Sequence, residues 1–72
     1  MRILVFQTNI DSKHHIETVQ PIFNNHSHIL DWSIDIEDID NVLRIESADH
    51  LHEADVMHLV SQYGFNCEDL VG

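Results

Sequence analysis

Histidine is the residue type with the clearest chemical potential in this sequence, because it accounts for 7 of the 72 residues. Four of the histidines form two His-x-His pairs, His26 with His28 and His50 with His52. Neutral imidazole nitrogens, together with carboxylates such as the adjacent Asp49, suit divalent ions of intermediate softness. The two pairs are therefore candidate ligands for Zn(II), Ni(II) or Cu(II) if the fold brings them together.

Two neighbouring histidines and an acidic run are further candidates. His14 and His15 are adjacent on a predicted helix, where successive side chains point about 100° apart, so both cannot bind one ion without distortion. One of them could bind a metal with a carboxylate from residues 37–40. We favour two solvated histidines, because a metal site needs three or four converging ligands. The acidic run lacks the glycine and the closing glutamate of an EF-hand loop.

The single cysteine, Cys67, excludes an internal disulfide and a cysteine-only zinc site. Glu68 and Asp69 follow it directly, and negative neighbours raise the pKa of a thiol and reduce its nucleophilicity. We therefore interpret Cys67 as a small buried core residue. The only glycines are Gly64 and Gly72, so the chain has no glycine-rich phosphate loop. No hydrolase or transferase motif is present, and the sequence predicts a protein that is not an enzyme.

The composition limits the classes of partner. With 3 Lys and Arg against 13 Asp and Glu, the formal net charge is −10, which argues against nucleic acid and against an anionic membrane. The longest N-terminal apolar run, residues 3–6, is too short for a signal peptide or a membrane span. These features predict a single cytoplasmic domain over residues 1–72, with another protein or a second copy of the chain as candidate partner.

The first half of the chain predicts a strand, a helix and a second strand. Residues 2–10 are rich in β-branched and aromatic side chains, which favour a strand. Apolar residues at helical spacing predict a helix over residues 13–25, with Ser12 as its N-cap and Pro21 as the cause of a kink or a loosened last turn. Apolar and polar residues alternate over residues 29–36, which predicts a strand with one buried face. That buried face is expected to consist of Leu30, Trp32, Ile34 and Ile36.

The second half predicts a hairpin and a second helix. Turn residues at 37–41 and a returning strand over residues 42–45 form the hairpin. The second helix is predicted over residues 51–63, with Asp49 as its N-cap. Its buried stripe is expected to consist of Val56, Leu59, Val60 and Tyr63.

A left-handed C-terminal cap at Gly64 and a short last strand over residues 65–71 complete the order. With right-handed crossovers, this order predicts an α+β, ferredoxin-like βαββαβ open sandwich, in which a four-stranded antiparallel sheet carries both helices on one face.

That topology also predicts where the histidine pairs lie. The strands over residues 29–36 and 42–45 are hairpin neighbours about 4.8 Å apart. The two loops that carry the pairs join these strands at the ends away from the hairpin turn, so the loops should be adjacent. Either the four histidines form a metal site there, or they are solvated and only gain charge in mild acid. We favour the second interpretation, because loop positions rarely converge on a tetrahedron by chance.

The order of elements resembles the heavy-metal-associated domain of copper chaperones and metal-pumping ATPases. The resemblance is also local: it includes Thr8-Asn9-Ile10 before the first helix, Val19-Gln20-Pro21 within it, and Tyr63-Gly64-Phe65 before the last strand. It extends over nearly the whole chain. It implies the ferredoxin-like fold and, in the family, a Cu(I) site with a Cys-x-x-Cys motif at the first helix.

The chain departs from the family at that motif, since Ser12 and His15 stand where the family has its two cysteines. Thiolates select Cu(I) because they are soft donors, and a serine hydroxyl is not. We favour Ser12 as a helix cap rather than as a ligand position that has lost its cysteine.

The leading hypothesis is therefore a non-enzymatic domain of this fold that lacks the thiolate site and acts as a protein-interaction or self-association module. Ile3, Val5 and Val42, on the predicted helix-free face of the sheet, could form a small contact patch. The alternative is binding of Zn(II), Ni(II) or Cu(II) by histidines and carboxylates.

Overall fold

The structure is a computed structural model that describes residues 1–70. Its elements are β1 (Arg2–Thr8), α1 (Lys13–Asn24), β2 (Ile29–Asp35), β3 (Val42–Ser47), α2 (Glu53–Ser61) and β4 (Cys67–Asp69). This is the order that the sequence predicts. Most elements are a few residues shorter than predicted, and the last strand has three residues. Val71, at the end of the predicted last strand, lies outside the described residues.

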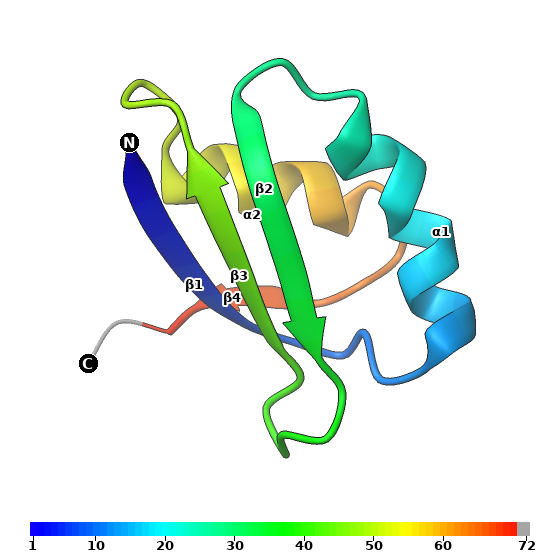
Figure 1. Cartoon of the computed structure of the whole chain (residues 1–72). Helices are drawn as coiled ribbons and strands as arrows, with labels where there is room; N and C mark the ends of the chain where they lie inside the picture. Colours follow the sequence, from blue (N-terminus) through cyan, green and yellow to red (C-terminus); the bar gives the residue numbers. More distant parts are fainter. Residues whose placement is uncertain (71–72) are drawn as a thin grey trace.

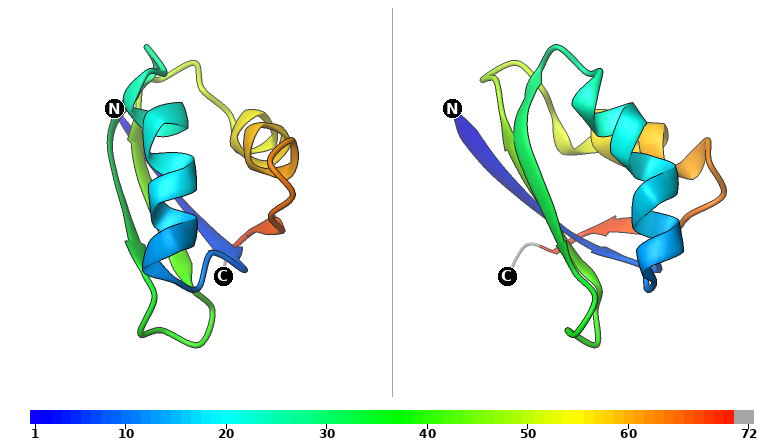
Figure 2. Two further views of the ribbon diagram at one scale, coloured as in Figure 1. Left: turned by 90° about the vertical axis from the view of Figure 1, so that its right-hand side faces the viewer. Right: turned by 45° about the vertical axis from the view of Figure 1, so that its right-hand side comes forward.

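The four strands form one antiparallel sheet in the order β2-β3-β1-β4. Both helices lie against the same face of this sheet and leave the other face uncovered (Figures 1 and 2). The predicted ferredoxin-like βαββαβ sandwich is therefore confirmed. No helix in the part of the chain that the structure describes is long and apolar enough to cross a membrane.

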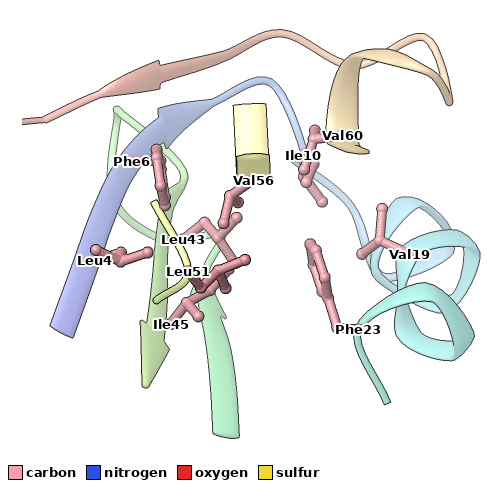
Figure 3. Close-up of a cluster of buried hydrophobic side chains, with 10 residues drawn as sticks. All are labelled: Leu4, Phe6, Ile10, Val19, Phe23, Leu43, Ile45, Leu51, Val56 and Val60. Carbon is pink, nitrogen blue, oxygen red and sulfur yellow. The ribbon is translucent and has the colours of Figure 1, made fainter. Parts of the chain in front are cut away.

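The core lies between the sheet and the helices (Figure 3). Alternate residues of β1 and β3 point into it, because side chains alternate between the two faces of a strand. Helical spacing brings Val19 and Phe23 of α1 to the same core. Its buried side chains are Leu4, Phe6, Ile10, Val19, Phe23, Leu43, Ile45, Leu51, Val56 and Val60. Each such side chain contributes about 1.5–3 kcal/mol by its burial.

The buried face predicted for the second strand is only partly right. The register between β2 and β3 shifts at the start of β2, and an extra residue in one strand reverses the alternation of its side chains. As a result Ile29 packs against the core, whereas Leu30 is 60% exposed. Trp32 and Ile34 pack against the core as predicted. Ile36 lies beyond the end of β2 and is exposed.

The predicted N-cap of the second helix is wrong. The helix begins at Glu53 and its N-cap is His52. The Asp55 carboxylate accepts a hydrogen bond of 3.0 Å from the His52 N–H, which satisfies one of the amides that a helix start leaves unpaired. Asp49 instead accepts a hydrogen bond of 2.6 Å from the Met1 amino group. That contact lowers the pKa of the Asp49 carboxyl below its ordinary value.

The buried stripe of the second helix is shorter than predicted. Val56 and Val60 are buried, and Leu59 is half-buried against the core. Tyr63 is 51% exposed, because it follows the end of α2. Gly64 has a φ of +85°, so the predicted left-handed conformation at this position is confirmed.

In the first helix, Pro21 does not end the element. α1 continues through Pro21 to Asn24, and the Asn25 N–H donates a hydrogen bond of 3.1 Å to the Pro21 carbonyl. The last turn of the helix is therefore closed.

Candidate functional site

Three loops meet at the end of the molecule where the family resemblance places a metal. We call this the Ser12 end and define it as residues 9–12, 36–41 and 65–66. The side chain of Thr8, only 7% exposed, joins two of the loops. Its Oγ1 donates a hydrogen bond of 2.6 Å to the Asn41 carbonyl and accepts one of 3.2 Å from the Ile10 N–H. The Thr8 N–H also donates to the Asp40 carbonyl, at 3.0 Å.

The third loop joins the Ser12 end through Asn9. The Asn9 Oδ1 accepts a hydrogen bond of 2.8 Å from the Asn66 N–H. The sequence reasoning did not identify Thr8, Asn9 or Asn41 as residues that hold these loops together. The available signal was Asn41 in the turn before a strand, where it adopts a φ of +46°, a conformation that asparagine tolerates better than most residues.

Ser12 is the N-cap of α1, as predicted, and its Oγ accepts a hydrogen bond of 3.2 Å from the His15 N–H. The His15 ring packs edge-on against Phe65, with 5.1 Å between ring centroids. Its Nδ1 lies 3.0 Å from the Asp11 carboxylate without the angle of a hydrogen bond. At both positions where the family has a cysteine, the side chain therefore contributes to local structure.

The acidic hairpin turn lies at this same end, because Thr8 donates hydrogen bonds to the backbone carbonyls of Asp40 and Asn41. However, nowhere in residues 1–70 do three or more His, Cys, Asp or Glu side chains converge in a way that could hold a metal ion.

The predicted adjacency of the two histidine loops is found at the opposite end of the molecule. We call this the histidine end and define it as residues 25–28 and 48–52. The Ala48 N–H donates a hydrogen bond of 2.9 Å to the His28 carbonyl and so joins the two loops. The ring centroids of His28 and His50 are 4.1 Å apart, with the rings nearly perpendicular, and those of His26 and His28 are 5.7 Å apart.

The fourth histidine of the predicted set does not join the other three. His52 Nδ1 lies 3.4 Å from the guanidinium of Arg2. Arg2 also donates to the Leu51 carbonyl at 2.8 Å and to the Glu53 carboxylate at 3.0 Å. A backbone hydrogen bond and then this contact with Arg2 lower the pKa of the Glu53 carboxyl. The role of Arg2 was not anticipated from the sequence.

Cys67 in β4 packs against the core but is only half-buried, so its interpretation as a buried core residue is right in part. Burial, and to a smaller extent the Asp69 carboxylate, raises the pKa of the Cys67 thiol to about 12. Cys67 also borders an open polar hollow together with Gln7 and Asn66. A thiol with so high a pKa is a poor nucleophile at neutral pH.

The helix-free face of the sheet carries the predicted apolar patch. Ile3 is 42% exposed, and Val5 and Val42 are half-buried. Leu70, 38% exposed, extends the patch, since its N–H donates a hydrogen bond of 2.9 Å to the Val5 carbonyl. Strand alternation places four carboxylates and one guanidinium on this face. They are Asp31, Asp35, Glu46, Glu68 and Arg44.

Comparisons with known proteins identify the fold. The sequence matches no protein-family model and no curated protein. Among solved structures, the yeast copper transporter domain Ccc2a, studied in apo and Cu(I)-loaded states, has a TM-score of 0.81 at 13% identity, covering 97% of this chain and 96% of that one. A chain in the Atx1–Cu(I)–Ccc2a complex has a TM-score of 0.84 at 12% identity, covering 99% and 97%. The fold is thus that of these copper-transport domains, as the resemblance implied.

Proposed function

We propose that the chain is a non-enzymatic protein-interaction module of the heavy-metal-associated fold that lacks the thiolate Cu(I) site. It binds a basic partner protein through the helix-free face of its sheet. The observation that carries the proposal is that a partly exposed apolar patch and four carboxylates share that face. The proposed setting is the cytoplasm, where the single cysteine stays reduced.

Cu(I) transport is not part of the proposal, because the chain lacks the two thiolates that bind Cu(I) in the family. Ser12 caps a helix and His15 packs on Phe65, so neither side chain is left as a soft ligand. The comparisons are compatible with an interaction role, since one matching chain belongs to a complex of two proteins.

The charge distribution favours a different protein over a second copy of the chain. Two copies, each with a formal charge of −10, repel one another, and pairing of the helix-free faces would bring eight carboxylates together. On each face the only guanidinium, that of Arg44, already lies 3.7 Å from the Glu46 carboxylate. A partner with a basic rim and an apolar centre would complement the face in both charge and hydrophobicity.

The experiment compares capture of partner proteins by immobilised wild-type chain and by variants. Ile3→Glu places a charge in the apolar patch, and Ile39→Glu makes the same change at the hairpin tip, where the side chain is 94% exposed. We expect Ile3→Glu to lose a basic protein that both the wild type and Ile39→Glu capture. We also expect higher salt to weaken the capture, because it depends on charge complementarity.

A second pair of measurements can overturn the proposal. The double variant Asp31→Lys with Asp35→Lys should lose the same partner, while circular dichroism confirms that it is folded. Capture that is unchanged by Ile3→Glu and by this charge reversal would exclude the helix-free face. A concentration-dependent dimer in sedimentation equilibrium that Ile3→Glu disrupts would replace the basic partner with a second copy of the chain.

A further inference from the structure

A different site lies at the histidine end, and it does not depend on the proposed interaction role. We propose that His28 and His50 together bind one divalent transition-metal ion, Zn(II), Ni(II) or Cu(II), and so connect the loop before β2 to the loop before α2. The site is at the opposite end of the molecule from Ser12 and uses imidazole rather than thiolate ligands.

The backbone already holds the two imidazoles at close range. His28 directly precedes β2 and His50 follows β3, and these two strands are paired in the sheet from Ile29 and Ser47 onwards. The hydrogen bond from the Ala48 N–H to the His28 carbonyl fixes the two loops to each other at 2.9 Å. The resulting separation of 4.1 Å between ring centroids is short enough for one ion to bridge the rings after a local rotation. Metal binding therefore requires little further ordering of the backbone of these two loops.

The pair His28 and His50 is distinguished from the other two histidines by what each imidazole contacts. His26 Nδ1 accepts a hydrogen bond of 3.1 Å from the His28 N–H, and His52 Nδ1 faces Arg2. Within residues 1–70, no hydrogen bond or ion pair involves the imidazole of His28 or of His50. The two rings contact other histidine rings, but in the described residues their nitrogens are not engaged in hydrogen bonds.

The ring orientation requires one movement before a metal binds. The rings are at 84° to each other, edge to face, so their nitrogens do not yet point to one position. His50 is exposed, and exposed side chains change rotamer in nanoseconds, so this movement is rapid. His28 is half-buried, so we assign the movement to His50.

Two protein ligands are fewer than the three or four of a typical zinc site, and the described residues offer no group of three ligand side chains. The proposed site is therefore an open one, with water at the remaining coordination positions. The charge of the protein favours a cation there. The whole chain has a formal charge of −10, whereas the Asp49 carboxylate next to His50 is already paired with the Met1 amino group at 2.6 Å and is not part of the proposed site. Neutral imidazole suits Zn(II), Ni(II) and Cu(II) better than Ca(II) or Mg(II), which prefer oxygen ligands.

Calorimetric titration of the full chain with each of the three metal chlorides tests the site. We expect the wild type to bind one ion, and His28→Ala and His50→Ala each to weaken binding at least about tenfold, since even loss of a residue that only supports a ligand costs about 10–100-fold. His58→Ala is the matched control, because His58 is an exposed histidine on α2, and this variant should bind like the wild type.

Two further readouts locate the ion and connect it to folding. Substoichiometric Cu(II) should broaden the amide NMR signals of residues 25–28 and 48–52 before those of residues 9–15. Zn(II) should raise the thermal unfolding midpoint of the wild type and leave that of His50→Ala unchanged, because an ion that binds only the folded state stabilises it. The proposal is wrong if the wild type binds none of the three ions. It is also wrong if His28→Ala and His50→Ala bind as the wild type does, or if substitution of Ser12 and His15 abolishes the binding.

Discussion

At the Ser12 end, side chains of Thr8 and Asn9 join three loops by hydrogen bonds, whereas at the histidine end a single backbone hydrogen bond joins two loops. The side chains of Thr8, Asn9 and Ser12 are therefore occupied by the fold. At the histidine end, the His28 and His50 imidazoles lie together and neither forms a hydrogen bond or an ion pair within the described residues, although the His28 ring also lies 5.7 Å from that of His26. At the end that resembles a known metal site, Ser12 and His15 contribute to the local structure. At the other end, the His28 and His50 imidazoles are still able to bind a ligand.

The largest effect is expected from restoring the missing thiolates at the Ser12 end. The double variant Ser12→Cys with His15→Cys should bind about one equivalent of Cu(I) under reducing, anaerobic conditions, where the wild type binds none that competes with a chromophoric chelator. Two thiolates one helical turn apart supply the soft donors that the wild type lacks.

The single variant Ser12→Cys is the control for this experiment, because it offers only one thiolate in the loop. If the double variant gains no Cu(I) binding, the likeness of fold does not extend to the geometry of residues 12–15. The Ser12 end would then differ from the histidine end only in how its side chains pack, and not in having the geometry of a metal site.

The second prediction concerns Cys67, the single cysteine of the chain, which pairs with Thr8 in the sheet next to the Ser12 end. A pKa of about 12 leaves almost no thiolate at pH 8, whereas an unfolded cysteine has a pKa of about 8.5. Thiol reagents should therefore label the folded chain at least about 100-fold more slowly than the urea-unfolded chain at pH 8. The labelling rate of the folded state should still be rising above pH 9, because its thiol deprotonates only near pH 12. Equal rates for folded and unfolded protein would mean that Cys67 is an accessible thiolate and a candidate ligand.

The fold could be predicted from the sequence because the patterns that indicate it are local and occur in several elements. Alternation in β1, the spacing of Val19 and Phe23 in α1, and the glycine at position 64 each depend on neighbouring residues alone. The adjacency of the His28 and His50 loops followed from the strand order, and the structure places their rings 4.1 Å apart.

What the sequence did not predict depends on contacts between residues far apart in the chain. The shift of register that exposes Leu30 arises from the pairing of β2 with β3. Asp49 was predicted as a helix cap, but the Met1 amino group, 48 residues away in sequence, binds it instead. Arg2 withdraws His52 from the histidine cluster in the same way. Local patterns contain no information about these competing partners.

The third prediction measures how strongly Thr8 holds the Ser12 end together. Thr8→Val keeps the shape of the side chain but leaves the Asn41 carbonyl and the Ile10 N–H without this partner in a largely buried position. Each unsatisfied buried group costs about 1–3 kcal/mol, so urea unfolding should show a loss of about 2–3 kcal/mol. Thr18→Val, which removes an exposed hydroxyl from α1, is the matched control and should change the free energy of unfolding by less than about 0.5 kcal/mol. Equal effects of the two substitutions would show that Thr8 is not what joins these loops.

The smallest effects are expected on the free energy of unfolding, and they distinguish Ser12, whose side chain stabilises a helix, from His50, whose imidazole forms no hydrogen bond in the described residues. Ser12→Ala removes the N-cap of α1 and should lower the free energy of unfolding by about 1 kcal/mol, whereas Ser12→Asn keeps a capping oxygen and should restore most of it.

In metal-free buffer, His50→Ala should change the same free energy by less than about 0.5 kcal/mol, because the exposed His50 imidazole makes no hydrogen bond in the described chain. Urea unfolding of the three variants in parallel gives the comparison. If His50→Ala costs as much as Ser12→Ala without metal, the His50 imidazole is part of the structure and the contrast between the two ends disappears. If Ser12→Asn fails to restore stability, Ser12 contributes something other than a cap, and its position would again be a candidate ligand.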